Sequence, residues 1–211
     1  MKTKTLVRLL GICAAVVLSS CSTVSVKQIA GDQPVPELKE KLCKGSWRAA
    51  DGTIATFRMK DEATGLLEID TREKDGTRKK ANLAVRTLGE RMVATFWEDG
   101  KKPGDEPMVF GRMAIAEDHL SIFLPDVVVF LDAVKKQTIA GQIKQEKAPV
   151  EAEKQTTKPE SAILEKFGLA EAEKVGGVLK CFDADPGVVL LRESREEAPE
   201  RKSGKSGRTK K

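Results

Sequence analysis

Apolar and polar residues alternate over short stretches, separated by turn residues, from Gly45 to about residue 124. Within residues 53–60, Ala55, Phe57 and Met59 alternate with polar residues. Successive side chains of a strand point to opposite faces, so this period of two predicts strands with one buried face. The pattern predicts seven strands, over residues 45–50, 53–60, 64–71, 81–88, 91–97, 107–116 and 119–124.

Turn residues separate these stretches at regular intervals. They are Asp51-Gly52, Lys74-Asp75-Gly76, Gly89-Glu90 and Glu117-Asp118, with a longer loop over residues 99–107. Asp-Gly pairs supply the backbone angles that tight hairpins need. The sequence therefore predicts a mainly β fold, an antiparallel up-and-down barrel or sandwich with one or two short helices.

Residues 126–136 break this rhythm, because Val127, Phe130, Leu131 and Val134 share one face of a helix. Pro125-Asp126 is a suitable start for a helix here. The three valines at 127–129 leave a strand as the alternative, since β-branched residues lower helix propensity. Further predictions are a strand over 138–144, helices over 161–167 and 170–175, and a closing hairpin formed by residues 178–182 and 188–192.

The first twenty residues have the pattern of an export signal. Lys2, Lys4 and Arg8 precede an apolar run, Leu9–Leu18, that is too short to span a bilayer, which takes about 20 residues. The rest divides into a membrane tether, a single β domain with a mobile insertion, and a disordered basic tail. These segments are residues 21–42, 43–198 with the insertion at 145–159, and 199–211.

Leu18-Ser19-Ser20-Cys21 resembles the lipobox of bacterial lipoproteins. The resemblance implies that Cys21 becomes the N-terminus and carries diacylglycerol on its sulfur and a fatty acyl chain such as palmitate on its amine. It also implies an outer-membrane lipoprotein facing the periplasm in a Gram-negative cell, because Ser22 is not aspartate. The alternative is an ordinary secretory signal with a cysteine near its cleavage site.

The distribution of charged residues along the chain bears on whether nucleic acid is an expected partner. Three of the 37 Lys and Arg residues lie in the signal, which leaves 34 against 32 acidic residues. Residues 199–211 hold six of those 34 and one acid, so residues 21–198 carry 28 positive and 31 negative charges. The basic pI belongs to the two ends of the chain, so we expect no nucleic-acid partner.

Four cysteines are present, of which Cys13 leaves with the signal and Cys21 is the predicted anchor. Cys43 and Cys181 remain, and an oxidising envelope favours a disulfide between them. Two buried thiols that do not meet are the alternative, because cysteine is also a common small core residue.

Gly45-Ser46-Trp47, followed by Asp51-Gly52, resembles the opening of the calycin folds, which include the lipocalins and lipocalin-like bacterial lipoproteins. The resemblance implies that Trp47 packs across the closed end of a barrel and that Arg192, from the last strand, lies over its ring. The alternative is that Trp47 is simply a large core residue.

Catalytic chemistry is not indicated. The chain has one histidine, His119, in a predicted turn, and no cluster of Cys and His with the spacing of a zinc site. Serines have no nucleophile-elbow setting. We therefore predict no enzymatic activity, no metal and no cofactor.

Two functions remain open. The first is the binding of a small apolar ligand inside the barrel by Phe57, Met59, Met92, Phe96, Phe110 and Phe123, which would equally well fill a solid core. The second is a structural or adaptor role, in which the basic tail contacts an anionic envelope polymer or a partner protein. A solubilising tail with no partner is the alternative to that contact.

Overall fold

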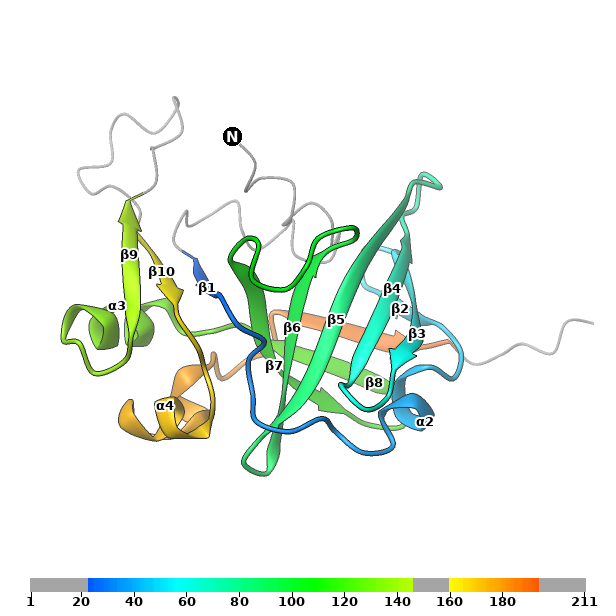
Figure 1. Ribbon diagram of the computed structural model, residues 1–211. Coiled ribbons are helices and arrows are strands. Elements are labelled where there is room, and N and C mark those ends of the chain that lie inside the picture. The colour runs from blue at the N-terminus through cyan, green and yellow to red at the C-terminus, as the bar shows by residue number, and fades with distance from the viewer. Residues whose placement is uncertain (1–22, 146–159, 194–211) are drawn as a thin grey trace, which may run out of the picture.

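The computed structural model describes residues 23–145 and 160–193 (Figure 1). Its elements, in chain order, are β1 (Val24–Val26), α2 (Leu38–Leu42), β2 (Trp47–Ala49), β3 (Ile54–Asp61), β4 (Leu66–Arg72), β5 (Arg78–Leu88), β6 (Arg91–Glu98), β7 (Met108–Ile115), β8 (His119–Phe123), α3 (Val127–Lys135), β9 (Gly141–Gln145), β10 (Glu160–Leu164), α4 (Leu169–Lys174), the 3₁₀ helix η2 (Val178–Cys181) and β11 (Val188–Arg192).

Eight of the strands form a closed antiparallel barrel. Strands β2 to β8 pair in chain order, and β11 closes the ring by pairing with both β8 and β2. The seven strands predicted from the alternating pattern correspond to β2 through β8, and the last predicted strand is β11. The predicted fold class is therefore confirmed as a mainly β, closed barrel.

A three-stranded extension branches from the barrel at β7. The second half of β7 pairs with β8, while Met108 and Val109 at its start pair with β1. Strand β1 lies parallel to β10, which pairs in turn with β9. The extension stands on the opposite side of the molecule from β3 and β4 (Figure 1).

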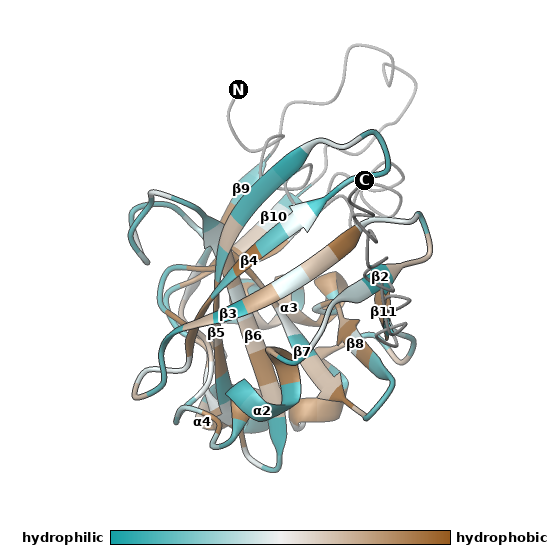
Figure 2. Ribbon diagram, turned by 90° about the vertical axis from the view of Figure 1, so that its right-hand side faces the viewer, coloured by the Kyte–Doolittle hydropathy of each residue, from teal (hydrophilic) through white to brown (hydrophobic). Residues whose placement is uncertain are grey.

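The apolar side chains form two separate clusters on the two faces of the barrel wall. The interior cluster takes residues from all eight barrel strands and from α2. The outer cluster lies between the outward faces of β5, β6 and β7 and the extension, together with α3, α4 and η2. Strands β5 to β7 therefore bury apolar side chains on both faces, whereas in β3 hydrophilic residues alternate with apolar ones (Figure 2).

One end of the barrel is closed by the segment that leads into α2. Leu38 and Leu42 are fully buried against the interior cluster, and Val35 joins them. Both views place α2 at the lower end of the barrel strands (Figures 1 and 2). The α2 helix therefore acts as a plug for this end.

The predicted tether over residues 21–42 is wrong from residue 24 onward. Strand β1 is paired on both edges, the Ala30 amide donates to Thr95 Oγ1 at 2.9 Å, and the Asp32 amide donates to the Thr87 carbonyl at 2.8 Å. The segment reads as polar in sequence, but its few apolar residues are buried and its backbone is bonded to the barrel wall. The folded domain consequently starts close to Cys21.

Two further local predictions are wrong. Residues 161–167 were expected to form a helix, but 160–164 form β10, because the neighbouring strands β1 and β9 supply backbone partners on both sides. Residues 178–182 were expected to be a strand, but Val178–Cys181 form η2 after Gly177, which has a φ of 102°. The predicted helices over 126–136 and 170–175 are confirmed as α3 and α4.

The α3 helix begins at a residue suited to the task. Asp126 accepts hydrogen bonds from the amides of Val128 and Val129, at 2.9 and 3.1 Å. This cap offsets the low helix propensity of the three valines.

The predicted signal, Cys21, the core of the insertion (146–159) and the tail lie outside the described residues.

The expected disulfide is absent, since Cys43 and Cys181 are both free thiols. Cys43 lies against the interior cluster, while Cys181 is buried in the outer cluster. The barrel wall separates these two clusters, so the side chains do not meet. Burial raises the pKa of both thiols, to about 11 for Cys181, where the carboxylate of Asp126 adds to the effect.

Candidate functional site

The closed end of the barrel is built around Trp47, which is fully buried. Its indole nitrogen donates to the Leu42 carbonyl at 3.0 Å, which fixes α2 to β2, the first strand of the barrel. The guanidinium carbon of Arg192 lies 4.6 Å from the Trp47 ring centroid, and its Nη2 donates to the Lys41 carbonyl at 2.7 Å. The contact between Trp47 and Arg192 that the calycin resemblance implies is thus present, and it joins β2, β11 and the α2 plug.

Of the six residues predicted to line a binding site, four belong to the barrel interior. Phe57, Met59, Met92 and Phe96 all lie in or against the interior cluster. There they pack against side chains from every other strand of the barrel. The interior is filled over this region by the protein's own side chains.

The interior cluster is slightly exposed at the end opposite α2 and more exposed at the α2 end, where Cys43, Met59, Met92 and Ile115 are only partly buried. Ala49, Phe96, Ile122 and Val188 lie near the strand ends opposite α2 and are 5–8% exposed, while Leu67, Leu83, Val85 and Leu120 are completely buried. The exposed members are all apolar. Apolar side chains of the interior cluster are therefore accessible to a small degree at both ends of the barrel.

Phe110 and Phe123 do not line the interior, so that part of the prediction is wrong. In β7 the inward side chains include Met113, and Phe110 has the opposite parity. Phe110 instead packs against Phe130, Phe167 and Phe182, with ring centroids 5.9, 5.2 and 6.1 Å away. These four rings join the barrel to α3, η2 and the chain after β10.

The outward face of β3, β4 and β5 carries a set of cations that we call the basic wall. It consists of the exposed side chains of Arg58, Lys60, Arg72, Arg78 and Lys80. Three acids, Asp61, Glu68 and Asp70, point outward from the same strands, so the face has a net charge of +2 from these eight residues.

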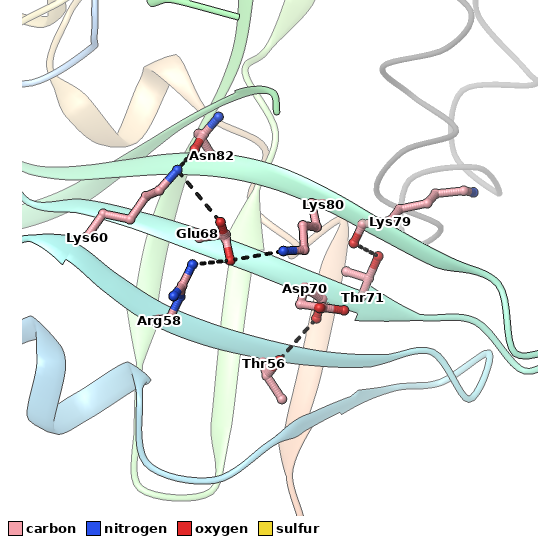
Figure 3. Close-up of polar contacts among 9 residues, drawn as sticks. All are labelled: Thr56, Arg58, Lys60, Glu68, Asp70, Thr71, Lys79, Lys80 and Asn82. Carbon is pink, nitrogen blue, oxygen red and sulfur yellow. Dashed lines mark hydrogen bonds and ion pairs between the residues drawn. The ribbon is translucent and has the colours of Figure 1, made fainter. Parts of the chain in front are cut away.

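Glu68 stands at the centre of the basic wall (Figure 3). Its carboxylate lies 2.8 Å from Arg58 Nη2, 3.6 Å from Lys80 Nζ and 3.7 Å from Lys60 Nζ. Lys60 also donates to Asn82 Oδ1 at 3.1 Å. Three cations thus share one nearly buried carboxylate, and the surplus positive charge faces solvent.

The charge balance at Glu68 shifts its pKa. Burial raises the pKa of the carboxyl, but the hydrogen bond and charge of Arg58, with the charges of Lys80 and Lys60, outweigh burial and lower it below the ordinary value of 4.5. A lowered pKa means that the folded state favours the ionised form of the Glu68 carboxyl over the protonated form. The resulting stability is present above the ordinary pKa and is lost as pH falls through the lower folded value.

We expect Glu68→Gln to lower the free energy of unfolding by about 1 kcal/mol at pH 7, because Arg58, Lys60 and Lys80 then repel one another without a shared anion. Near pH 3 the wild-type carboxyl is increasingly protonated, so the gap between the two proteins should narrow. Urea unfolding of both proteins at pH 7 and pH 3 measures the gap. An equal gap at the two pH values would contradict this account.

Other chemistry is sparse in the part of the chain that the structure describes. There, no three His, Cys, Asp or Glu side chains group so as to hold a metal ion. His119 is exposed at the start of β8, with its Nδ1 2.8 Å from Asp118. Within residues 23–145 and 160–193, no helix is long and apolar enough to cross a bilayer.

The basic wall was not predicted as a site. Its sequence signal is the polar half of the alternation in β3 and β5, where arginine and lysine occupy outward positions. Sequence alone places such residues on a solvated face, and only the register brings Glu68 between Arg58 and Asn82.

Comparison with known proteins finds no match for the chain among protein-family models, curated proteins or solved structures.

Proposed function

We propose that this protein is a lipid-anchored component of the cell envelope, with a lipocalin-like barrel and no enzymatic activity, that binds an anionic envelope polymer through its basic wall. The observation that carries the proposal is the basic wall, with five exposed cations on three adjacent strands. Such a surface attracts polyanions without needing a specific sequence in them.

The filled interior supports a role for the outer surface. The largest interior side chains, among them Trp47, Leu67 and Met113, are less than 2% exposed and belong to one continuous cluster. A small barrel packed in this way is a rigid scaffold. Binding then falls to the outer face, where charge is concentrated.

The position of the basic wall favours a polymer over the anchoring bilayer. If Cys21 is acylated, the membrane lies next to β1, and β1 is on the opposite side of the barrel from β3 and β4 (Figure 1). The wall then faces away from the bilayer that holds the anchor. The basic tail, with six cations in residues 199–211, would add to the attraction.

Binding to a polyanion should weaken when the wall is neutralised. The variant Arg58→Gln, Lys60→Gln, Lys80→Gln also carries Glu68→Gln, so that no carboxylate is left unpaired. It loses two net positive charges, at up to about 1 kcal/mol each, so its affinity for a sulfated polysaccharide should fall about tenfold at low salt. Titration at low and high ionic strength measures the affinity, and the wild-type protein should lose most of its binding at high salt.

The control for this experiment is the variant Lys174→Gln, Lys180→Gln, which changes two exposed lysines on α4 and η2 and loses the same net charge. It should bind as the wild-type protein does. Equal weakening in both variants would show that net charge, and not the basic wall, determines binding. Equal affinity of the wall variant and the wild-type protein would refute the wall's role, and retention that depends only on residues 199–211 would assign binding to the tail.

A second candidate function is the binding of an apolar ligand at the end of the barrel opposite α2. The observation that favours it is the set of apolar interior side chains there that keep a small exposed fraction, among them Phe96 at 5% and Ile122 at 8%. Lipid that copurifies with the protein and contacts these residues would support this candidate.

The location in the envelope is part of the proposal and depends on the lipobox. An acylated Cys21 with two or more chains would anchor the domain stably, at about 0.8 kcal/mol for each buried methylene. Mass spectrometry of the native N-terminus tests this directly. An unmodified chain that still begins at Met1 would remove both the anchor and the periplasmic location.

A further inference from the structure

Three arginines stand together on the outward face of β5, β6 and β7. Arg86 of β5 lies opposite Val93 of β6, and Val93 lies opposite Arg112 of β7. Arg91 precedes Val93 by two residues in β6 and therefore shares its face. The three arginines therefore occupy positions around Val93, a fully buried residue of the outer cluster over which Gly31 packs.

Within the described residues, none of these three arginines has an acidic partner within 4.0 Å, unlike Arg48 and Arg58 elsewhere on the barrel. The Nε atoms of Arg86 and Arg112 are buried and have no hydrogen-bond partner in that part of the chain. The guanidinium of Arg112 lies 3.5 Å from the Phe123 ring centroid, a contact that holds it in place and neutralises none of its charge.

This arrangement is costly for the protein by itself. Burial and the charge of Arg91 both lower the pKa of Arg112, and both effects show that its charged form is disfavoured. Buried donors without acceptors destabilise a fold, and so do like charges without a counter-ion. Groups with these properties are complementary to an anion that supplies both the acceptors and the charge.

We propose that Arg86, Arg91 and Arg112 form a binding site for a phosphate group, as a monoester or diester. The planar guanidinium fork pairs with two phosphate oxygens at once, and a tetrahedral phosphate has enough oxygens to engage more than one arginine. Arg91 is exposed and Arg86 and Arg112 are partly exposed, so the group can approach from solvent. The site uses none of the basic-wall residues and goes beyond the polymer binding proposed above.

Thermal unfolding of the full chain lacking residues 1–20, in low-millimolar phosphate and in chloride of equal ionic strength, tests the proposal. Wild-type protein should unfold at a higher temperature in phosphate, because a ligand of the folded state stabilises it. Arg91→Gln, a change at an exposed side chain, should weaken phosphate binding at least tenfold and abolish this rise. It should also unfold no earlier than the wild-type protein in chloride, since it removes a repulsion.

Two further variants separate charge from geometry. Arg112→Lys keeps the charge but lacks the fork, so it should also lose most of the rise, whereas Lys180→Gln should keep it. An equal rise in the wild-type protein, Arg91→Gln and Arg112→Lys would overturn the proposal, because phosphate also stabilises proteins non-specifically. No rise in the wild-type protein, together with no binding to phosphatidic acid, would overturn it as well.

Vesicles distinguish the two sources of the phosphate group. Binding to vesicles that contain phosphatidic acid but not to pure phosphatidylcholine, lost in Arg91→Gln, would assign the site to a lipid headgroup. A thermal shift with free phosphate and no vesicle binding would assign it to a soluble phosphate compound. Because Arg58, Lys60 and Lys80 are intact in these variants, polymer binding should be unchanged, and the two proposals can fail independently.

Discussion

Trp47→Ala should lower the free energy of unfolding by about 3–5 kcal/mol. The ring is fully buried between α2 and the barrel, so its removal leaves a cavity at the closed end. The Leu42 carbonyl loses its 3.0 Å donor, and Arg192 loses the ring beneath its guanidinium. Urea unfolding followed by circular dichroism measures the loss.

Trp47→Phe and Arg48→Ala are the matched controls for this prediction. The phenylalanine retains most of the volume but not the N–H donor, so it should cost about 1–2 kcal/mol. Arg48 is the next residue of β2 and points outward, so its replacement should cost less than about 1 kcal/mol. If Trp47→Ala were no more damaging than Arg48→Ala, the plug would not be a stabilising element of the barrel.

Phe110→Ala should cost about 3–5 kcal/mol, because Phe110 is the barrel's contribution to the aromatic cluster with Phe130, Phe167 and Phe182. These rings connect the barrel to the extension and its helices. Hydrogen exchange in β9 and β10 should therefore accelerate together with the loss of global stability.

The control here is Val128→Ala on α3, since that side chain is 76% exposed. Its effect should stay within about 0.5 kcal/mol of zero. Unchanged exchange rates in β9 and β10 of Phe110→Ala would mean that the extension is held by its strand pairing with β7 and not by the aromatic cluster.

The barrel strands were predictable because local signals agree with the final fold. From β2 to β8, apolar residues recur along each strand, most regularly in β3, and each short connection has turn residues, so neighbours in sequence become neighbours in the sheet. The calycin resemblance implied that Arg192 of the last strand lies over the Trp47 ring, and the register of Arg192 opposite Trp47 agrees with it.

The errors over β1, β7 and β10 concern segments whose structure depends on distant partners. Phe110 was placed inside because β7 reads as a strand with one buried face, yet the extension covers its other face as well. Residues 160–164 have a composition that suits a helix or a strand, and pairing with β1, more than 130 residues away in the chain, determines the outcome. Short-range patterns carry no information about such contacts.

The candidate sites were the least predictable part. A polar face in a strand pattern is ordinarily a solvated surface, so neither the basic wall nor the three arginines near Val93 stood out in the sequence. Their significance comes from what lies beside them: Glu68 shared by three cations in one case, and no described carboxylate within 4.0 Å in the other.

The pairing of β1 on both edges has a mechanical consequence for a lipid-anchored protein. One residue, Ser22, separates Cys21 from Thr23, so their Cα atoms can be at most about 7 Å apart. If Cys21 carries lipid, a connection that short would hold the barrel against the headgroups in a restricted range of tilts. The width of the barrel would then determine how far the strands remote from β1 lie from the membrane. Inserting a flexible spacer after Ser22 would free that orientation without touching the fold.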